Sequence, residues 1–338
     1  MNANIQALLN ALLATHKTQN LSALMAIPQR FNEWKDELVS RAEMAQALNM
    51  ALFSGILDRV PSGMAYTSEV AARGAKVMLD HGALRTVRWF DLGQLPPGEA
   101  AITRVLRPLG FRLNGVFPLA RLKMTGRSYA HLDDAENISQ FFVSELHPER
   151  FSEDFQAAVS RVLGNSIDPL TPAAVCLLNE LERDAYLPIA QAQILLPILV
   201  SCFERQHAIP SLLDYEILRA ESAEMAWIAT EGNVFNHATD RVADVFALAE
   251  QQRALGRAMK ANVEVSSSGR IKQTALKADP VTRQFVDADG NIIEREVPGS
   301  FYEFITRDFM SEGEGKKLDL GFDAGNAQGI FKMTVNAN

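Results

Sequence analysis

The stretch His81-Gly82-Ala83-Leu84-Arg85 decides how this chain is organised, because its outline recurs as His237-Ala238-Thr239-Asp240-Arg241. The chain has only six histidines, so two of them in one His-x-x-x-Arg setting indicate a shared role. Histidine is the side chain most used for metal ligation and for proton transfer near neutral pH. Arginine adds a permanent cation that binds carboxylates. The repeated pattern therefore predicts a metal site that handles an anionic substrate.

The sequence around both copies predicts the same order of elements, namely a strand, a helix and then more strands. The elements predicted for the first unit are a strand at 83–90, a helix at 99–109 and strands between 111 and 146. Those predicted for the second unit are a strand at 233–237, a helix at 241–255 capped by Asp240, and strands between 263 and 307 with a hairpin turn at 287–290. We therefore expect an α+β fold in which two β-α-β-β-β units pair and enclose the site between curved sheets.

Helical patterns fill the rest of the chain. One helix is predicted to begin at Thr67 or Ser68 and to run to about Asp80, with Gly82 as its end. We expect a single elaborated catalytic domain, 1–338, with four parts: N-terminal helices at 1–80, the first unit at 81–150, a helical insertion at 151–230 and the second unit at 231–338.

Composition and missing motifs exclude several classes of function. A net charge of −8 over 338 residues argues against nucleic acid or an anionic membrane as the main partner. The sequence contains no G-x-G-x-x-G, P-loop, G-x-S-x-G or H-E-x-x-H motif. Its two cysteines, Cys176 and Cys202, are isolated, and no signal peptide or membrane span is evident. We therefore expect a cytoplasmic enzyme, and the sequence leaves its oligomeric state open.

A third ligand is needed if His81 and His237 bind a metal. Two imidazoles and one carboxylate leave coordination positions open, as in non-haem iron(II) oxygenases. Glu303 lies in the apolar stretch Phe301-Tyr302-Glu303-Phe304-Ile305, where an ionised carboxylate needs a partner. Glu145, in the comparable strand of the first unit, is the alternative. Glu303 is the preferred third ligand, although an edge-strand glutamate facing water would give the same pattern.

The two arginines of the repeat are given different roles. If the residues after His81 form a strand, Arg85 points to the same face as His81, with Cα atoms ~13 Å apart. Arg85 can then bind the far carboxylate of a dicarboxylic acid whose other end contacts the metal. Arg241 is expected to have a structural role. The remaining histidines, His16, His131, His147 and His207, are interpreted as structural.

Four segments of the chain resemble one known family. They are Asp80-His81-Gly82-Ala83-Leu84-Arg85, Phe142-Val143-Ser144-Glu145-Leu146, Phe235-Asn236-His237-Ala238-Thr239 and Tyr302-Glu303-Phe304-Ile305. These segments resemble the 2-oxoadipate dioxygenase/decarboxylase family, which is distantly similar to hydroxymandelate synthase-type enzymes of the vicinal oxygen chelate fold. The resemblance extends from about residue 30 to the C-terminus.

The resemblance implies an activity and a ligand set. His81, His237 and Glu303 would be Fe(II) ligands, and Arg85 would lie in the substrate pocket. The implied reaction converts 2-oxoadipate and O2 to 2-hydroxyglutarate and CO2, a step of lysine catabolism. Two alternatives stay open, a metal-dependent isomerase or lyase of the same fold that does not use O2, and a non-catalytic protein that binds small acids.

Overall fold

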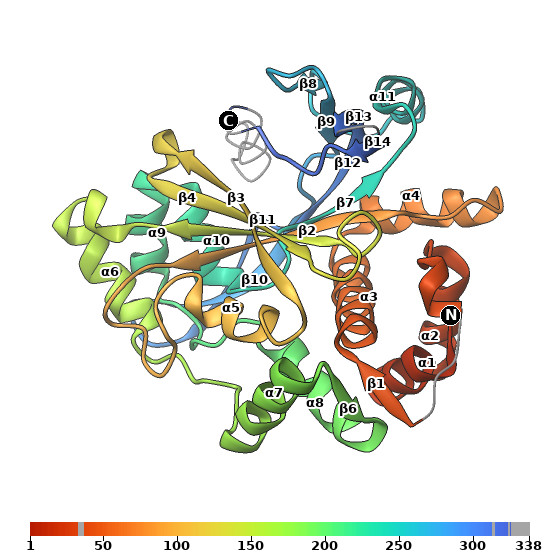
Figure 1. Cartoon of the computed structure of the whole chain (residues 1–338). Coiled ribbons are helices and arrows are strands. Elements are labelled where there is room, and N and C mark those ends of the chain that lie inside the picture. The colour runs from red at the N-terminus through yellow and green to blue at the C-terminus, as the bar shows by residue number, and fades with distance from the viewer. Residues whose placement is uncertain (33–36, 313–314, 324, 326–338) are drawn as a thin grey trace.

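The centre of the computed structural model is a strongly curled eight-stranded sheet, with strand order β3-β4-β5-β2-β7-β12-β9-β8 (Figure 1). The structure describes residues 1–32, 37–312, 315–323 and 325. The first half of the sheet contains β2 (Leu79–Val87), β3 (Phe111–Leu119), β4 (Met124–His131) and β5 (Gln140–Leu146). The second half contains β7 (His237–Arg241), β8 (Glu264–Val265), β9 (Ile271–Ala275) and β12 (Phe301–Arg307).

The two halves have the same topology. In the first, β2 pairs in parallel with β5, and β5, β4 and β3 form an antiparallel meander. In the second, β7 pairs in parallel with β12, and β12, β9 and β8 are antiparallel neighbours. The antiparallel pair β2–β7 joins the halves at the middle of the sheet. The predicted α+β fold of two β-α-β-β-β units is therefore confirmed.

Helices pack against the strands of the sheet. The helices before and within the first unit are α1 (Ala3–Asn10), α2 (Thr15–Leu24), α3 (Arg41–Arg59), α4 (Pro61–Ala72) and α5 (Ala100–Leu106). Those of the central segment and the second unit are α6 (Glu153–Leu163), α7 (Pro172–Asp184), α8 (Ile189–Ser201), α9 (Leu212–Glu221), α10 (Ala223–Glu231) and α11 (Val245–Ala254). None of the helices in the described part of the chain combines the length and the apolar character that crossing a bilayer requires.

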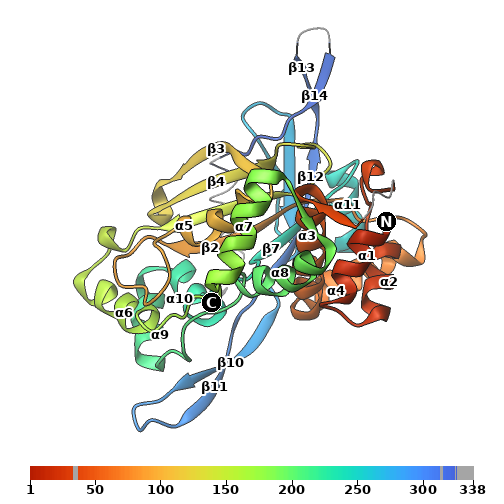
Figure 2. The same cartoon turned by 60° about the horizontal axis from the view of Figure 1, so that its bottom comes forward.

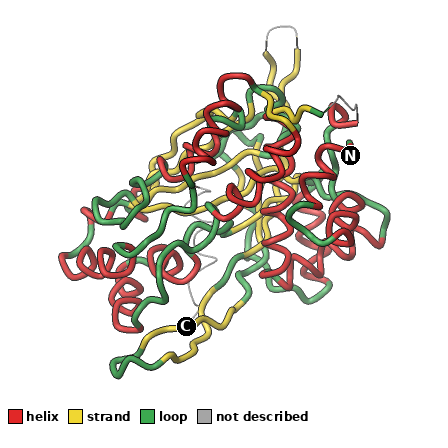
Figure 3. Tube along the Cα trace, turned by 90° about the horizontal axis from the view of Figure 1, so that it is seen from below, coloured by secondary structure: helices red, strands yellow, loops and turns green. Residues whose placement is uncertain are grey.

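Three short two-stranded pairings complete the structure. β1 (Leu38–Ser40) pairs with β6 (Tyr186–Pro188) in the helical region. The hairpins β10–β11 (Pro280–Val286 and Ile292–Pro298) and β13–β14 (Phe309–Glu312 and Gly315–Leu318) project from opposite ends of the molecule (Figures 2 and 3). The predicted turn at 287–290 joins β10 to β11.

The start of the first unit differs from its prediction. α4 ends at Ala72, and β2 begins at Leu79, so His81 lies inside a strand and no helix runs to Asp80. Gly82 does not end a helix. A Cβ at this position would lie 2.0 Å from the Phe235 ring, so Gly82 is required by packing. The sequence pattern predicted a helix end at Gly82. In the structure this glycine allows a close contact with Phe235, which is distant in the sequence.

The second unit shows a related error. The predicted helix at 241–255 begins only at Val245, where the Asp244 side chain accepts hydrogen bonds from two backbone N–H groups of the first turn. Asp240 is not a cap. It belongs to β7, is buried, and accepts a hydrogen bond from the Tyr66 hydroxyl at 2.6 Å. A tertiary contact therefore holds Asp240 in the strand.

Candidate metal centre

The register of the three central strands places His81, His237 and Glu303 on one face of the sheet. Thr239 on β7 pairs with His81 on β2 and with Glu303 on β12, so the three residues form one row across three strands. His237 lies two residues before Thr239 and therefore shares its face, since side chains alternate along a strand. The sheet thus brings together three residues from distant parts of the sequence.

The donor atoms of the three side chains are close enough to share one ion. Nε2 of His237 lies 3.0 Å from Oε2 of Glu303, and Nε2 of His81 lies 3.6 Å from the same oxygen. One ligand atom from each of the three residues lies within 4.8 Å of the other two. Neighbouring ligands of a metal with bonds of about 2.1 Å are about 3 Å apart. The two separations between histidine nitrogen and glutamate oxygen are therefore close to those of neighbouring ligands of one metal.

Burial and mutual charge shape the titration of this group. All three residues are at most 4% exposed. Burial favours the neutral acid, but the two histidines outweigh it and hold the pKa of Glu303 below its ordinary value. Burial lowers the pKa of His237, whereas Asp80 and Glu303 raise that of His81 against the effect of burial. Glu303 is therefore an ionised carboxylate at neutral pH, as metal ligation requires.

Each histidine is held by the residue that precedes it. Oδ1 of Asp80 lies 2.8 Å from Nδ1 of His81, and the Asn236 amide lies 3.0 Å from Nδ1 of His237. A partner on Nδ1 fixes the ring and leaves the Nε2 lone pair for a metal. Asp80 and Asn236 thus have matching roles in the two halves.

The Asn236 amide supplies a test of whether a metal fits. Among the described residues, its buried Oδ1 has no hydrogen-bond partner while its Nδ2 faces the imidazole. Oxygen and nitrogen of an amide are assigned from the hydrogen-bond network, so the side chain can be turned by 180°. The turned Oδ1 accepts from Nδ1–H of His237, which removes the unsatisfied oxygen and frees Nε2. The residues therefore fit a bound metal.

The alternative third ligand, Glu145, lies on the other face of the sheet. It pairs with Thr86 on β2, one position out of phase with His81 and Arg85. Its carboxylate accepts a hydrogen bond from the Glu99 backbone at 2.9 Å and lies 3.3 Å from the Arg127 guanidinium. Glu145 therefore stabilises the start of α5 and cannot reach the histidines.

A pocket opens beside the donor atoms. Its wall contains the apolar side chains of Ala83, Phe142 and Phe322 and the polar side chains of Ser144, Gln273 and Asp323.

Arg85 lies on the same face as His81 but outside this lining, two residues beyond Ala83 on β2. Its guanidinium lies over the Trp227 ring of α10, 4.8 Å from the ring centre. Burial lowers the pKa of Arg85 to about 10, and Glu224 partly offsets this. Arg85 therefore stays charged at neutral pH in an apolar setting.

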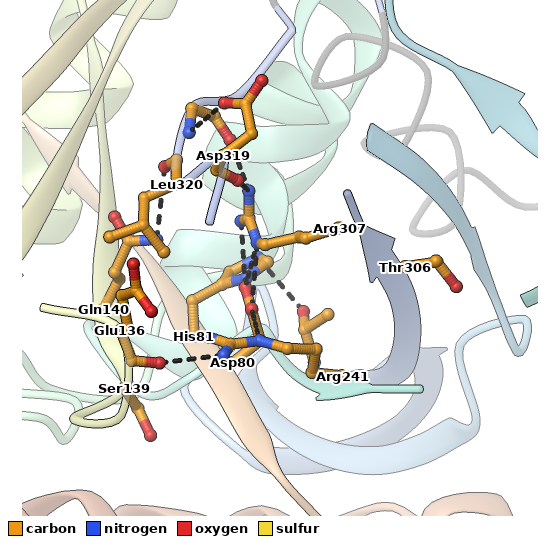
Figure 4. Close-up of polar contacts among 12 residues, drawn as sticks. Asp80, His81, Glu136, Ser139, Gln140, Arg241, Thr306, Arg307, Asp319 and Leu320 are labelled. Carbon is orange, nitrogen blue, oxygen red and sulfur yellow. Dashed lines mark hydrogen bonds and ion pairs between the residues drawn. The ribbon is translucent and has the colours of Figure 1, made fainter. Parts of the chain in front are cut away.

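Arg241 is not among the residues that line the pocket, and it contacts Asp80, the residue that precedes His81. Its Nε donates to Asp80 at 2.7 Å, and a second nitrogen donates to the Glu136 carbonyl at 2.8 Å (Figure 4). This arrangement matches the structural role expected of it. Backbone carbonyls hold two of the other histidines, His131 at Leu109 and His207 at Ala229.

Several residues of the centre were not singled out from the sequence. Asp80 and Asn236 could have been found, because a polar residue precedes each histidine of the repeat. Arg307 could not, because the Asp80 carboxylate that it binds is 227 residues away. The sequence around Phe322 likewise contains no pattern that indicates its place in the pocket wall.

Comparison with known proteins gives one family and one fold. The sequence profile of the 2-oxoadipate dioxygenase/decarboxylase family matches residues 56–328. A protein from Ralstonia eutropha JMP134, provisionally described as a glyoxalase superfamily member, is 62% identical, with a TM-score of 0.92 over 96% of this chain and 100% of its own. Hydroxyglutarate synthase from Oryza sativa, solved with 2-oxoadipate, is 19% identical, with a TM-score of 0.65 over 93% of this chain and 96% of its own. The Pseudomonas putida hydroxyglutarate synthase, also solved with 2-oxoadipate, is 21% identical. Its TM-score is 0.58, over 81% of this chain and 66% of its own. Among proteins with curated descriptions, the comparison finds no match.

Proposed function

Because this chain belongs to the 2-oxoadipate dioxygenase/decarboxylase family, we propose that it is an Fe(II) enzyme that decarboxylates and hydroxylates a 2-oxo acid. The proposed substrate is 2-oxoadipate, which with one O2 gives 2-hydroxyglutarate and CO2. The observation that carries the proposal is the buried group of His81, His237 and Glu303, whose donor atoms converge on one point. Two neutral nitrogens and one carboxylate are the donor set of non-haem iron(II) oxygenases.

His81, His237 and Glu303 would hold the metal from one side. Bound iron would supply positions where the 2-oxo acid chelates and O2 is activated. Asp80 and Asn236 keep the two imidazoles oriented through Nδ1. The protein would keep the three ligands fixed beside the pocket.

Arg85 would bind the far carboxylate of the substrate. It lies on the same face as His81, four residues further along β2, which corresponds to ~13 Å between Cα atoms. Its charge is preserved in a buried setting, where a bidentate bond to a carboxylate is strong. The Trp227 ring supports the guanidinium from below. This pairing would select dicarboxylic over monocarboxylic 2-oxo acids.

The pocket wall would exclude water from the reacting atoms. Phe142 and Phe322 pack with ring centres 5.0 Å apart, and Phe301 stacks on His237 at 4.8 Å. Apolar rings beside the donor atoms strengthen the charge interactions inside the site and limit side reactions.

Oxygen uptake by the iron-loaded protein tests this proposal. The protein is reconstituted with Fe(II) without oxygen and then mixed with O2 and a series of 2-oxo acids of different length and charge. We expect uptake of one O2 for each CO2 and 2-hydroxyglutarate formed from 2-oxoadipate. Bound iron with no uptake for any acid would refute the dioxygenase, and turnover without O2 would favour an isomerase or lyase.

Substitutions test the ligand set. Glu303→Ala should abolish tight iron binding, because it removes the carboxylate ligand. Glu145→Gln is the matched control, since it changes a buried carboxylate on the other face of the same sheet. Loss of iron from E145Q with retention in E303A would contradict the assignment.

A further inference from the structure

A short C-terminal segment, which we call the strap (residues 319–323), crosses the mouth of the curled sheet. At one edge, the Asn114 amide on β3 donates to the Leu320 carbonyl at 3.3 Å. At the other edge, the backbone N–H and hydroxyl of Ser267, between β8 and β9, bind the Asp323 carboxylate at 3.0 and 3.1 Å. Since β3 and β8 are the outer strands of the sheet, the strap ties its two edges together.

Phe322 brings the strap into the metal pocket. Its ring meets the His81 ring edge-on, with centres 4.9 Å apart, and it also lines the cavity. The Arg307 guanidinium lies over the same Phe322 ring at 4.9 Å. The strap is therefore a wall of the pocket and a direct neighbour of a proposed ligand.

Arg307 on β12 binds both the strap and the carboxylate behind His81. Its Nε and one terminal nitrogen donate to Asp80 at 2.9 to 3.1 Å. The other terminal nitrogen donates to the carbonyls of Asp319 at 2.9 Å and Gly321 at 2.7 Å. Figure 4 shows this guanidinium between the strap above and the Asp80–His81 pair below. The buried Arg307 side chain thus links the strap to the Asp80–His81 pair.

The Arg307 guanidinium can transmit a structural change from Asp80 to the strap and from the strap to Asp80. Its donors form a rigid planar fork, so it makes all these bonds in one orientation only. With a metal bound at Nε2, the Nδ1–H of His81 would be more polarised and its hydrogen bond to Asp80 would be stronger. Asp80 then holds Arg307 in the orientation that also binds the strap carbonyls.

From these contacts we infer that Arg307 is a positioning residue that couples the strap to the metal ligand His81 through Asp80. Metal binding and closure of the strap therefore stabilise each other, by the same factor in both directions. The inference rests on the proposed metal site. It adds that occupancy of this site controls the wall of the substrate pocket.

Amide hydrogen exchange of the strap, with and without Co(II), tests the coupling in the unmodified protein. Co(II) is a useful probe because its visible spectrum reports ligation by the protein. We expect Co(II) to slow exchange at residues 319–323 about fivefold or more. Bound Co(II) with unchanged strap exchange would overturn the inference and leave the metal site intact. If Co(II) did not bind at all, the proposed metal site would fail first, and the inference would fall with it.

Three arginine-to-lysine variants locate the coupling. Arg307→Lys keeps the charge, but one ammonium cannot bind Asp80 and both carbonyls, so we expect the effect of Co(II) on strap exchange to disappear. Arg270→Lys is the control on the strap side, because Arg270 binds the Asp319 side chain at 2.7 Å. Arg241→Lys is the control on the Asp80 side. In both controls we expect the ratio of exchange rates with and without Co(II) to stay close to that of the unmodified protein.

The variants also separate coupling from general damage. The strap amides of R270K should exchange faster than those of the unmodified protein, both with and without Co(II). R241K should bind Co(II) more weakly. In both variants the ratio of strap exchange rates with and without Co(II) should be preserved. A folded R307K protein that retained the full ratio would refute the role of Arg307. If R307K does not fold, the comparison in the unmodified protein still decides whether the strap and the metal are coupled.

Discussion

The buried carboxyl of Asp240 makes the stability of this protein depend on pH in an unusual direction. Asp240 is 2% exposed, and burial raises its pKa from 3.8 to about 7, helped by the nearby charge of Asp80. Hydrogen bonds from the Tyr66 hydroxyl at 2.6 Å and the Met78 backbone at 2.9 Å only partly oppose this shift. The folded protein therefore holds a proton on Asp240 at pH values where the unfolded chain has lost it.

The sign and size of the effect follow from this difference. Between pH 4 and 7 the folded state binds more protons at this site than the unfolded state, so stability falls as pH rises. The gap between the two pKa values corresponds to about 4 kcal/mol above pH 7. Asp240→Asn removes the titrating group and keeps the shape. The free energy of unfolding of D240N relative to the unmodified protein should therefore increase by about 4 kcal/mol from pH 4 to 8.

Denaturant unfolding of the metal-free proteins across this pH range measures the difference. Asp133→Asn is a control of opposite sign, because the hydrogen bond from Arg41 lowers the pKa of Asp133. D133N should lose stability relative to the unmodified protein at neutral pH, and this loss should vanish as pH falls through the lowered pKa. Parallel stability curves for D240N and the unmodified protein would refute the reasoning.

Three further predictions concern the site. Gly82→Ala should destabilise the protein by about 1–3 kcal/mol in thermal or denaturant unfolding, because its Cβ would lie 2.0 Å from the Phe235 ring; full stability would show that this ring moves freely. Arg85→Lys should raise KM for 2-oxoadipate about 10- to 100-fold, the cost of a lost charge-assisted hydrogen bond, and should change KM little for a monocarboxylic 2-oxo acid. Equal effects on both acids would remove Arg85 from the recognition of the far carboxylate. Removal of the metal by a chelator should lower the free energy of unfolding by about 3 kcal/mol when free metal had been at a hundred times Kd, and E303A should show no such change.

The sequence predicted the fold, and it singled out the three residues that the structure brings together, because both depend on local pattern. Glu303 is recognisable as a charge within an apolar strand, and the two histidines as a repeat. Element boundaries were wrong where a distant contact overrides local preference. Gly82 was interpreted as a helix end, but it makes room for Phe235, and Asp240 was interpreted as a cap, but it binds Tyr66.

The hydrogen bonds that join Asp80, Arg307 and the strap could not be predicted from local sequence pattern, because their partners are also distant in the sequence. Arg307 has no neighbour in sequence that indicates its role, and its partners lie on β2 and on the strap. Asp80 is fully buried, and the cations of Arg307 and Arg241 hold its pKa well below its ordinary value despite burial. A charge of this kind can be explained only when its partners are known in space.

The symmetry of the two halves explains why the proposed metal site has two histidines but only one carboxylate among the described residues. His81 lies opposite Gln140 in the parallel pair β2–β5, and His237 lies opposite Phe301 in the parallel pair β7–β12. Two residues further on, the matching positions are Phe142 in the first half and Glu303 in the second. Phe142 lines the pocket where a second carboxylate would otherwise stand. The repeat therefore supplies two equivalent histidines, and because Phe142 occupies the position that Glu303 has in the second half, the two halves together supply one carboxylate to the proposed site.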